Sequence, residues 1–148
     1  MVEDQNFHKV KKIIFVLILF FVFASKSYSQ NFKLEKLVNL DSPWGSSFIN
    51  SNEIIITEKS GKIKIVNILS REVQEISHQL NFVVHGQGGL LDIIHKDNNI
   101  WISYTEDRGG YKTSTSIARA EFNKKQLNFK NIFQANPPID SGYHFGSR

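Results

Sequence analysis

The 148-residue sequence contains no cysteine, which excludes disulfides and thiolate metal sites. It also lacks a cluster of lysine and arginine. The net charge of +4 at pH 7 divides evenly, with +2 in residues 1–29 and +2 in the remainder. Nucleic-acid-binding domains carry concentrated basic patches, so we expect no nucleic-acid partner. The length suits one small domain with a weakly basic, solvated surface.

A long hydrophobic run is missing as well. The longest one, Ile13–Ala24, has twelve residues, whereas a membrane-spanning helix needs about 20. It follows the basic stretch His8–Lys12 and precedes the small and polar Ser25–Ser29, which is the order of a secretory signal peptide. We predict that residues 1–29 are a signal peptide cleaved before Gln30. The mature protein is then periplasmic or secreted, without stable membrane insertion. An uncleaved anchor is the alternative, because serine is a weaker cleavage signal than alanine.

No convincing helical pattern follows Gln30, where β-prone segments alternate with turns. We expect strands over 53–58, 62–65, 72–76, 90–95, 100–105, 113–122 and 126–133, a further apolar stretch beginning at Phe32, turns at 41–45 and 97–99, and a loop at 106–110. The 72–76 strand is the weakest, and we place it at a sheet edge. Short strands at close spacing predict an all-β sandwich, barrel or propeller, and periodicity alone does not choose among them.

One stretch, His85-Gly86-Gln87-Gly88-Gly89, places three glycines around a single glutamine just before an apolar strand. Glycine adopts backbone conformations closed to other residues and lets a ligand or a second backbone approach closely. The pattern predicts a tight loop that presents the Gln87 side chain. An ordinary turn before a core strand gives the same letters, because short glycine motifs are weak signals.

The other polar candidates have simpler structural explanations. His85 and His95 lie ten residues apart, but no carboxylate or third histidine has fitting metal-site spacing. We therefore predict no metal ligands, and place His85 in a loop and His95 at the turn after the strand. Asp92 should be hydrogen-bonded, because an unpaired carboxylate is costly to bury. Trp44 and Trp101 are predicted to be core residues.

Six segments, in their order and spacing, resemble the PQQ-dependent soluble aldose sugar dehydrogenases and glucose/sorbosone dehydrogenases. They are Ser42–Gly45, Ile55–Ile63, Gly86–Asp92, Ile102–Glu106, Ile117–Ala120 and His144–Arg148. The resemblance covers roughly Leu37 to Arg148 and implies an exported six-bladed β-propeller. Residues 30–148 would form its N-terminal part, about two blades, so that the chain resembles a fragment of about a third of the full protein.

The resemblance also implies two site residues. The family's PQQ-contacting glutamine falls on Gln87 and its catalytic base on His144. In that family the histidine removes the proton of the anomeric hydroxyl while hydride passes to the PQQ quinone, and a neutral imidazole can accept a proton near neutral pH. Tyr143 stands where a glucose-oxidising relative has an aspartate, which favours the broader aldose branch, and Ser147 stands where many members have glycine.

These expectations combine into a PQQ-dependent enzyme that oxidises aldose sugars and passes electrons to an external acceptor. Calcium is the second cofactor implied, with ligands in later blades that have no counterpart in this chain. An exported, non-catalytic β-propeller that binds carbohydrate or protein is the alternative. A membrane-anchored β-domain with a structural role is a third possibility.

Overall fold

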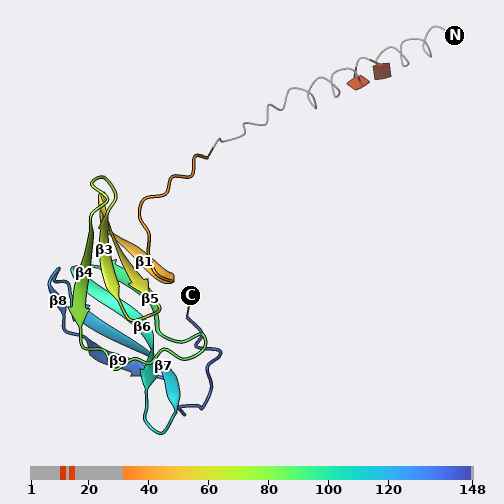
Figure 1. Cartoon of the computed structure of the whole chain (residues 1–148). Helices are drawn as coiled ribbons and strands as arrows, with labels where there is room; N and C mark the ends of the chain where they lie inside the picture. The colour runs from red at the N-terminus through yellow and green to blue at the C-terminus, as the bar shows by residue number, and fades with distance from the viewer. Residues whose placement is uncertain (1–10, 13, 16–31, 148) are drawn as a thin grey trace. The chain divides into compact units, whose positions relative to one another are not determined.

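The computed structural model describes residues 11–12, 14–15 and 32–147 (Figure 1). Residues 11–12 and 14–15 are helical, and the rest of the predicted signal peptide lies outside the described residues. The chain divides into two units, residues 1–35 and 36–148, and all strands belong to the second. Within the described residues, no helix is both long and apolar enough to cross a membrane.

Two β-sheets account for the fold, and no helix occurs between residues 32 and 147 (Figure 1). The first sheet has the order β1-β2-β3-β4-β8, formed by β1 (Pro43–Asn50), β2 (Glu53–Glu58), β3 (Ile63–Asn67), β4 (Val73–His78) and β8 (Gln126–Leu127). The second has the order β5-β6-β7-β9, formed by β5 (Leu90–Lys96), β6 (Asn99–Asp107), β7 (Thr113–Glu121) and β9 (Lys130–Gln134). All neighbouring strands are antiparallel except β4 and β8. The predicted all-β class is confirmed, and successive four-stranded antiparallel sheets are the building units of a propeller.

The hairpin between β5 and β6 shows how local sequence sets the register. Asp97 and Asn98 have φ values of 50° and 58°, and Lys96 pairs with Asn99 on either side of them. A two-residue hairpin turn with both residues left-handed matches the twist of its strands, and Asn and Asp tolerate this conformation best among non-glycine residues. This turn confirms the one predicted at 97–99.

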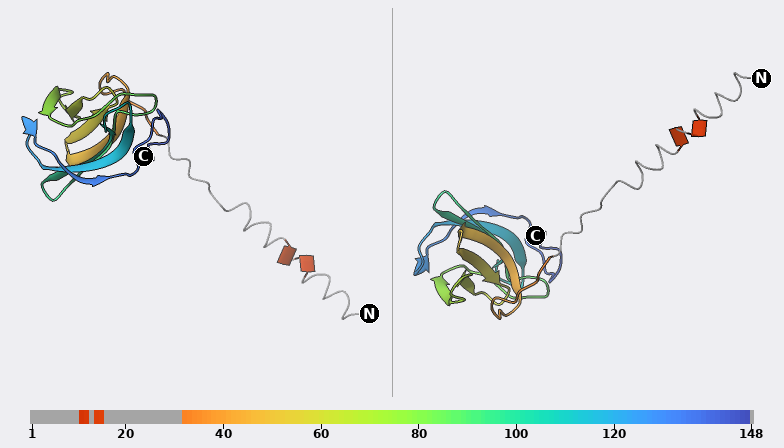
Figure 2. Two further views of the ribbon diagram at one scale, coloured as in Figure 1. Left: turned by 90° about the horizontal axis from the view of Figure 1, so that it is seen from below. Right: turned by 90° about the horizontal axis from the view of Figure 1, so that it is seen from above.

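One hydrophobic core joins the two sheets. Buried side chains of the first sheet pack with those of the second, and the cluster includes Ile55, Ile63, Ile65, Ile76, Leu90, Ile93, Ile100, Ile102, Tyr104 and Ala118. The views of Figure 2 show the sheet of the early strands against that of the later strands. Strands β1 and β2 contact β5 across this boundary. A Cβ on Gly45 would lie 2.7 Å from the Asp92 Cα, so β1 approaches β5 this closely only because Gly45 has no side chain.

The predicted strand over 126–133 is wrong in its continuity. It splits into β8, which runs parallel to β4, and β9, which returns to pair with β7. The chain leaves the strand path after Leu127, and the side chains of Leu127 and Phe129 are 0% and 7% exposed in the shared core. Burial of these two side chains between the sheets accounts for the break. The same crossing gives β4 an outer neighbour, so β8 and not β4 forms the edge that we predicted at 72–76.

The first described residues after the predicted cleavage site also differ from expectation. Residues 32–40 belong to no strand. The predicted turn at 41–45 is a bend only at residues 41–42, where Ser42 has a φ of 49°, and β1 begins at Pro43 with an irregular register between Pro43 and Ser46. Proline is tolerated here because β1 is an edge strand. Trp44 is 44% exposed and is not a core residue, whereas Trp101 is half-buried beneath the Arg119 guanidinium.

The loop predicted to begin at Glu106 starts later, because β6 extends to Asp107. Glu106 is 7% exposed and lies in a polar network between β6, β7 and β9. Its carboxylate accepts hydrogen bonds from Ser116 Oγ at 2.6 Å, Asn131 Nδ2 at 2.9 Å and Gln134 Nε2 at 2.8 Å. A buried carboxylate with this many donors is satisfied, so Glu106 has a structural role.

Candidate functional site

The glycine loop before β5 has no room for side chains at three of its four positions. A Cβ on Gly86 would lie 2.3 Å from Gly142 O, one on Gly88 would lie 2.6 Å from Thr105 Oγ1, and one on Gly89 would lie 2.2 Å from Lys59 O. Gly86 and Gly89 also have φ values of +55° and +152°. The loop therefore presents one side chain, that of the exposed Gln87, as the sequence predicts.

The segment 141–147 packs against this glycine loop. Gln87 N donates to Gly142 O at 2.7 Å, and Phe145 is 6% exposed. Thr115 Oγ1 donates to Phe145 O, and the Ser103 and Ser147 hydroxyl oxygens lie 2.5 Å apart. Side chains of β6 and β7 thus hold a segment that has no strand of its own.

Gln87 and His144, the two predicted site residues, lie together. The His144 main-chain N–H donates to Gln87 Oε1 at 3.3 Å. Because Oε1 is engaged, the amide Nε2 of Gln87 is the group left to donate to a ligand. His144 has a φ of 65°, and its side chain is exposed. Gly146, two residues later, has no atom within 4 Å of the position a Cβ would occupy, so the surface beside His144 is open.

Two further residues at the site were missed by sequence reasoning. Thr105 Oγ1 accepts a hydrogen bond from Gly89 N at 3.2 Å, and Thr105 N donates to Gly89 O at 2.9 Å. Lys59 Nζ, from the turn after β2, donates to Gly86 O at 2.5 Å. Both residues lie far from the loop in sequence. Only their membership in the segments 55–63 and 102–106, which already carried the family resemblance, pointed toward them.

The remaining candidates lie away from this pair. His95 belongs to β5 and not to the following turn, and its ring packs edge-on against Phe122 with centroids 5.1 Å apart. Asp92 is half-buried, and its main-chain N–H donates to Ser103 Oγ at 3.0 Å. In the described part of the chain, no group of three or more histidine and acidic side chains is placed to hold a metal.

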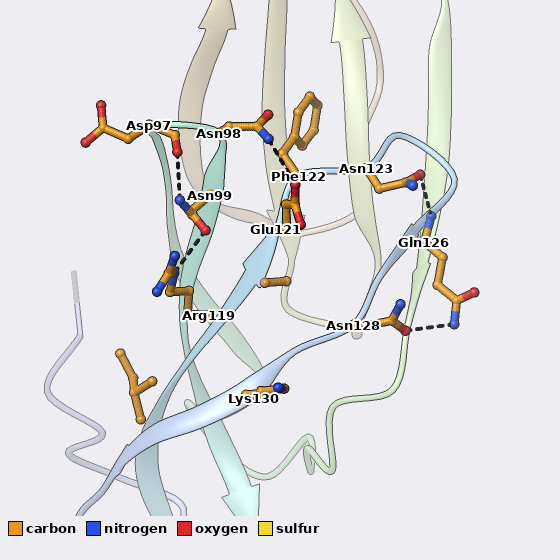
Figure 3. Close-up of a pocket in the computed structure, with 12 residues that line it drawn as sticks. Asp97, Asn98, Asn99, Arg119, Glu121, Phe122, Asn123, Gln126, Asn128 and Lys130 are labelled. Carbon is orange, nitrogen blue, oxygen red and sulfur yellow. Dashed lines mark hydrogen bonds between the residues drawn. The ribbon is translucent and has the colours of Figure 1, made fainter.

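A cavity of about 840 Å³ lies elsewhere (Figure 3). It is lined by the Asp97–Asn99 turn, by Arg119 and Glu121 of β7, and by Asn128 and Lys130. This turn follows β5, whereas Gln87 precedes it, so the cavity lies at the opposite end of the second sheet from Gln87. Several of its polar groups are engaged with each other, such as Arg119 Nε with Asn99 Oδ1 at 2.9 Å. Size alone therefore does not mark the site.

Comparison with known proteins places this geometry in a family context. The sequence profile of the Glucose / Sorbosone dehydrogenase family matches residues 40–148. Aldose sugar dehydrogenase YliI of Escherichia coli (strain K12) is 29% identical over 118 residues, which cover 74% of this chain and 32% of that protein. The chain thus spans about a third of the length of this relative.

Comparison with solved structures gives the same family context. The apo-form of the soluble aldose sugar dehydrogenase from Escherichia coli matches with a TM-score of 0.68 and 28% identity, covering 74% of this chain and 34% of that one. The PQQ-bound form of aldose sugar dehydrogenase from Streptomyces coelicolor matches with a TM-score of 0.59 and 20% identity, covering 67% of this chain and 32% of that one. These neighbours confirm the predicted fold class, in which the two sheets correspond to blades of the propeller.

Proposed function

Because this chain belongs to the glucose/sorbosone dehydrogenase family, we propose that it is part of a PQQ-dependent aldose sugar dehydrogenase. The observation that supports this proposal most directly is the hydrogen bond that joins Gln87 to His144 at an open, exposed surface. Two independent features of the sequence, the glycine loop and the segment 141–147, meet there. The matched relatives are about three times longer, so the activity is proposed for a longer protein that contains these residues.

The residues present fit a quinone cofactor and a sugar. Gln87 Nε2 is a neutral donor suited to a quinone or carboxylate oxygen. His144 carries an imidazole that can accept a proton, and the glycine loop brings main chain close to the surface without side chains in the way. Calcium, and the cations that bind the cofactor's carboxylates, are proposed to depend on residues of later blades.

The proposed roles follow from these groups. When bound, PQQ supplies a quinone that accepts a hydride. His144 removes the proton from the anomeric hydroxyl as the C1–H bond breaks, and the sugar becomes a lactone. Gln87 holds the His144 main chain through Oε1 and is left with Nε2 to orient the cofactor. Electrons from the reduced cofactor would then pass to an external acceptor. The proposed substrate is an aldose.

Steady-state kinetics of the full-length protein test this proposal. Purified protein is assayed with several aldoses and an artificial electron acceptor, before and after addition of PQQ with calcium. We expect oxidation only when PQQ is present. A folded protein that binds sugar but oxidises no aldose in the presence of PQQ would instead be a non-catalytic propeller.

We also propose that the protein is exported, with cleavage before Gln30. The support is the basic start and the short apolar run of residues 1–29. Mass spectrometry of the protein from the periplasm or medium should show an N-terminus close to Gln30. Recovery of a protein that retains residues 1–29 would contradict cleavage and favour a membrane anchor.

A further inference from the structure

We propose that Lys59 is a positioning residue that fixes the glycine loop, and through it the carboxamide of Gln87, from the neighbouring sheet. Lys59 follows β2 of the first sheet, whereas the loop precedes β5 of the second. The relevance of Gln87 to PQQ rests on the proposed function. The role of Lys59 in holding the loop rests on geometry alone.

Lys59 contacts both ends of the loop. Its Nζ donates to Gly86 O at 2.5 Å, a charge-assisted bond of the stronger kind. Its own carbonyl oxygen lies 2.2 Å from where a Cβ of Gly89 would be. The Lys59 main chain is itself fixed, because Lys59 N donates to Ser42 O at 3.0 Å. Lys59 therefore joins the residue before β1, the turn after β2 and the loop that carries Gln87.

The glycine backbone of the loop is costly to order, so each contact that holds it counts. Gly86 and Gly89 have positive φ values of +55° and +152°, and glycine loses more conformational freedom on ordering than any other residue. On one side, Gly142 O accepts the Gln87 N–H at 2.7 Å. Lys59 Nζ engages the Gly86 carbonyl, one residue earlier. Without its Nζ, the Gly86 carbonyl loses its charged donor and the Gln87 side chain samples more orientations.

Amide hydrogen exchange of the full-length protein, measured without cofactor, tests this role directly. The N–H groups of Gln87, Gly88 and Gly89 are hydrogen-bonded to Gly142 O, His85 O and Thr105 Oγ1, so their exchange reports loop opening. Lys59→Met keeps the length of the side chain and removes the donor. We expect about tenfold faster exchange at residues 87–89, as loss of a hydrogen bond to a charged group implies, and no comparable rise at amides that open independently of this loop.

Lys62→Met is the matched control. Lys62 lies in the same turn, its side chain is 53% exposed, and its ion pair is a weak one with Glu75 at 3.8 Å. Its substitution should leave exchange at 87–89 unchanged. Lys59→Arg, which restores a cationic donor, should return exchange to within about threefold of wild type. In the loaded enzyme, Lys59→Met should raise the PQQ concentration for half-maximal rate about tenfold and leave the KM for sugar unchanged.

Equal exchange rates in Lys59→Met and Lys62→Met would overturn the positioning role, whatever the enzyme does. A rise in exchange together with a wild type that oxidises no aldose would leave this role standing and contradict the proposed function. The positioning role of Lys59 and the proposed function can therefore be refuted independently.

Discussion

The His144 main-chain N–H donates to Gln87 Oε1 at 3.3 Å, which joins two residues 57 positions apart in the sequence. One residue is the proposed base and the other the proposed cofactor contact. The single carboxamide therefore has two tasks, with its oxygen fixing the base and its nitrogen free for a ligand. A substitution of Gln87 is therefore expected to alter the position of His144 even though His144 itself is unchanged.

Two substitutions at Gln87 should separate these tasks. Gln87→Glu keeps an acceptor for the His144 N–H and loses the donor, whereas Gln87→Ala loses both. Both should weaken PQQ binding by at least about 0.5–1.5 kcal/mol, the net value of a neutral hydrogen bond. Only Gln87→Ala should also lower kcat at saturating PQQ. Rates measured across a PQQ titration check this, and equal kcat values for the two variants would show that Oε1 does not position the base.

Gly89→Ala should destabilise the protein more than Gly110→Ala. Both glycines have positive φ, at +152° and +61°, so each alanine carries backbone strain of about 1–2 kcal/mol. A Cβ at Gly89 would also meet Lys59 O at 2.2 Å, whereas one at Gly110 meets no atom within 4 Å. Overpacking adds about 1–3 kcal/mol at Gly89. Denaturant unfolding of both variants measures the difference, and equal losses would contradict this packing.

Acid should weaken the fold through Glu58, which is fully buried. Burial raises the pKa of Glu58, but hydrogen bonds from Lys64 Nζ and Asp41 N outweigh it, and the pKa lies below its usual 4.5. The ionised carboxylate therefore stabilises the fold fully above pH 4.5, and this contribution is lost as the pH falls through the lowered pKa.

Glu58→Gln should accordingly reduce the free energy of unfolding at pH 7 by up to about 3–5 kcal/mol, because the side chains of Lys64 and Glu58 in this ion pair are only 17% and 0% exposed. It should also flatten the decline in stability below pH 4.5. Glu75→Gln is the control, since its ion pair with Lys62 is exposed and worth about 0–1 kcal/mol. Unfolding by denaturant at several pH values gives both results. An unaltered acid response in Glu58→Gln would contradict the assignment.

The β pattern and the glycine loop could be predicted from sequence because both are local. Isoleucine runs defined β2, and the Asp97-Asn98 pair defined a hairpin turn. The break between β8 and β9 could not be predicted, since the chain crosses from one sheet to the other after Leu127 and buries Leu127 and Phe129 in the core between the sheets. Lys59 was missed for the same reason, because its partner is 27 residues away and only the packing of two sheets brings them together.

Residues 30–148 alone should self-associate. Ile93 and Ala118 belong to the shared core, so their neighbours Ile94 and Ile117 face away from it by strand alternation. Phe133 pairs with Ile117 on that outer face, and Ile94 and Phe133 are 51% and 53% exposed. Two blades leave this face without the neighbour that a repeat architecture requires.

Sedimentation should therefore show association of residues 30–148 that decreases when Ile94 and Phe133 are replaced by lysine. Leu69→Lys is the control, because Leu69 is 73% exposed and lies in the turn between β3 and β4. A monomer with one cooperative unfolding transition would contradict this prediction.

Turnover of His144→Ala in the full-length, PQQ-loaded protein tests the central claim most directly. General base catalysis contributes about 10²–10⁴-fold, so we predict a loss of kcat in that range with several aldoses, in a variant that unfolds like wild type. Excess PQQ should not restore the rate, unlike the partial rescue expected for Gln87→Ala. Near wild-type turnover in His144→Ala would show that this residue is not the base, and would contradict the sugar-oxidising chemistry proposed for this site.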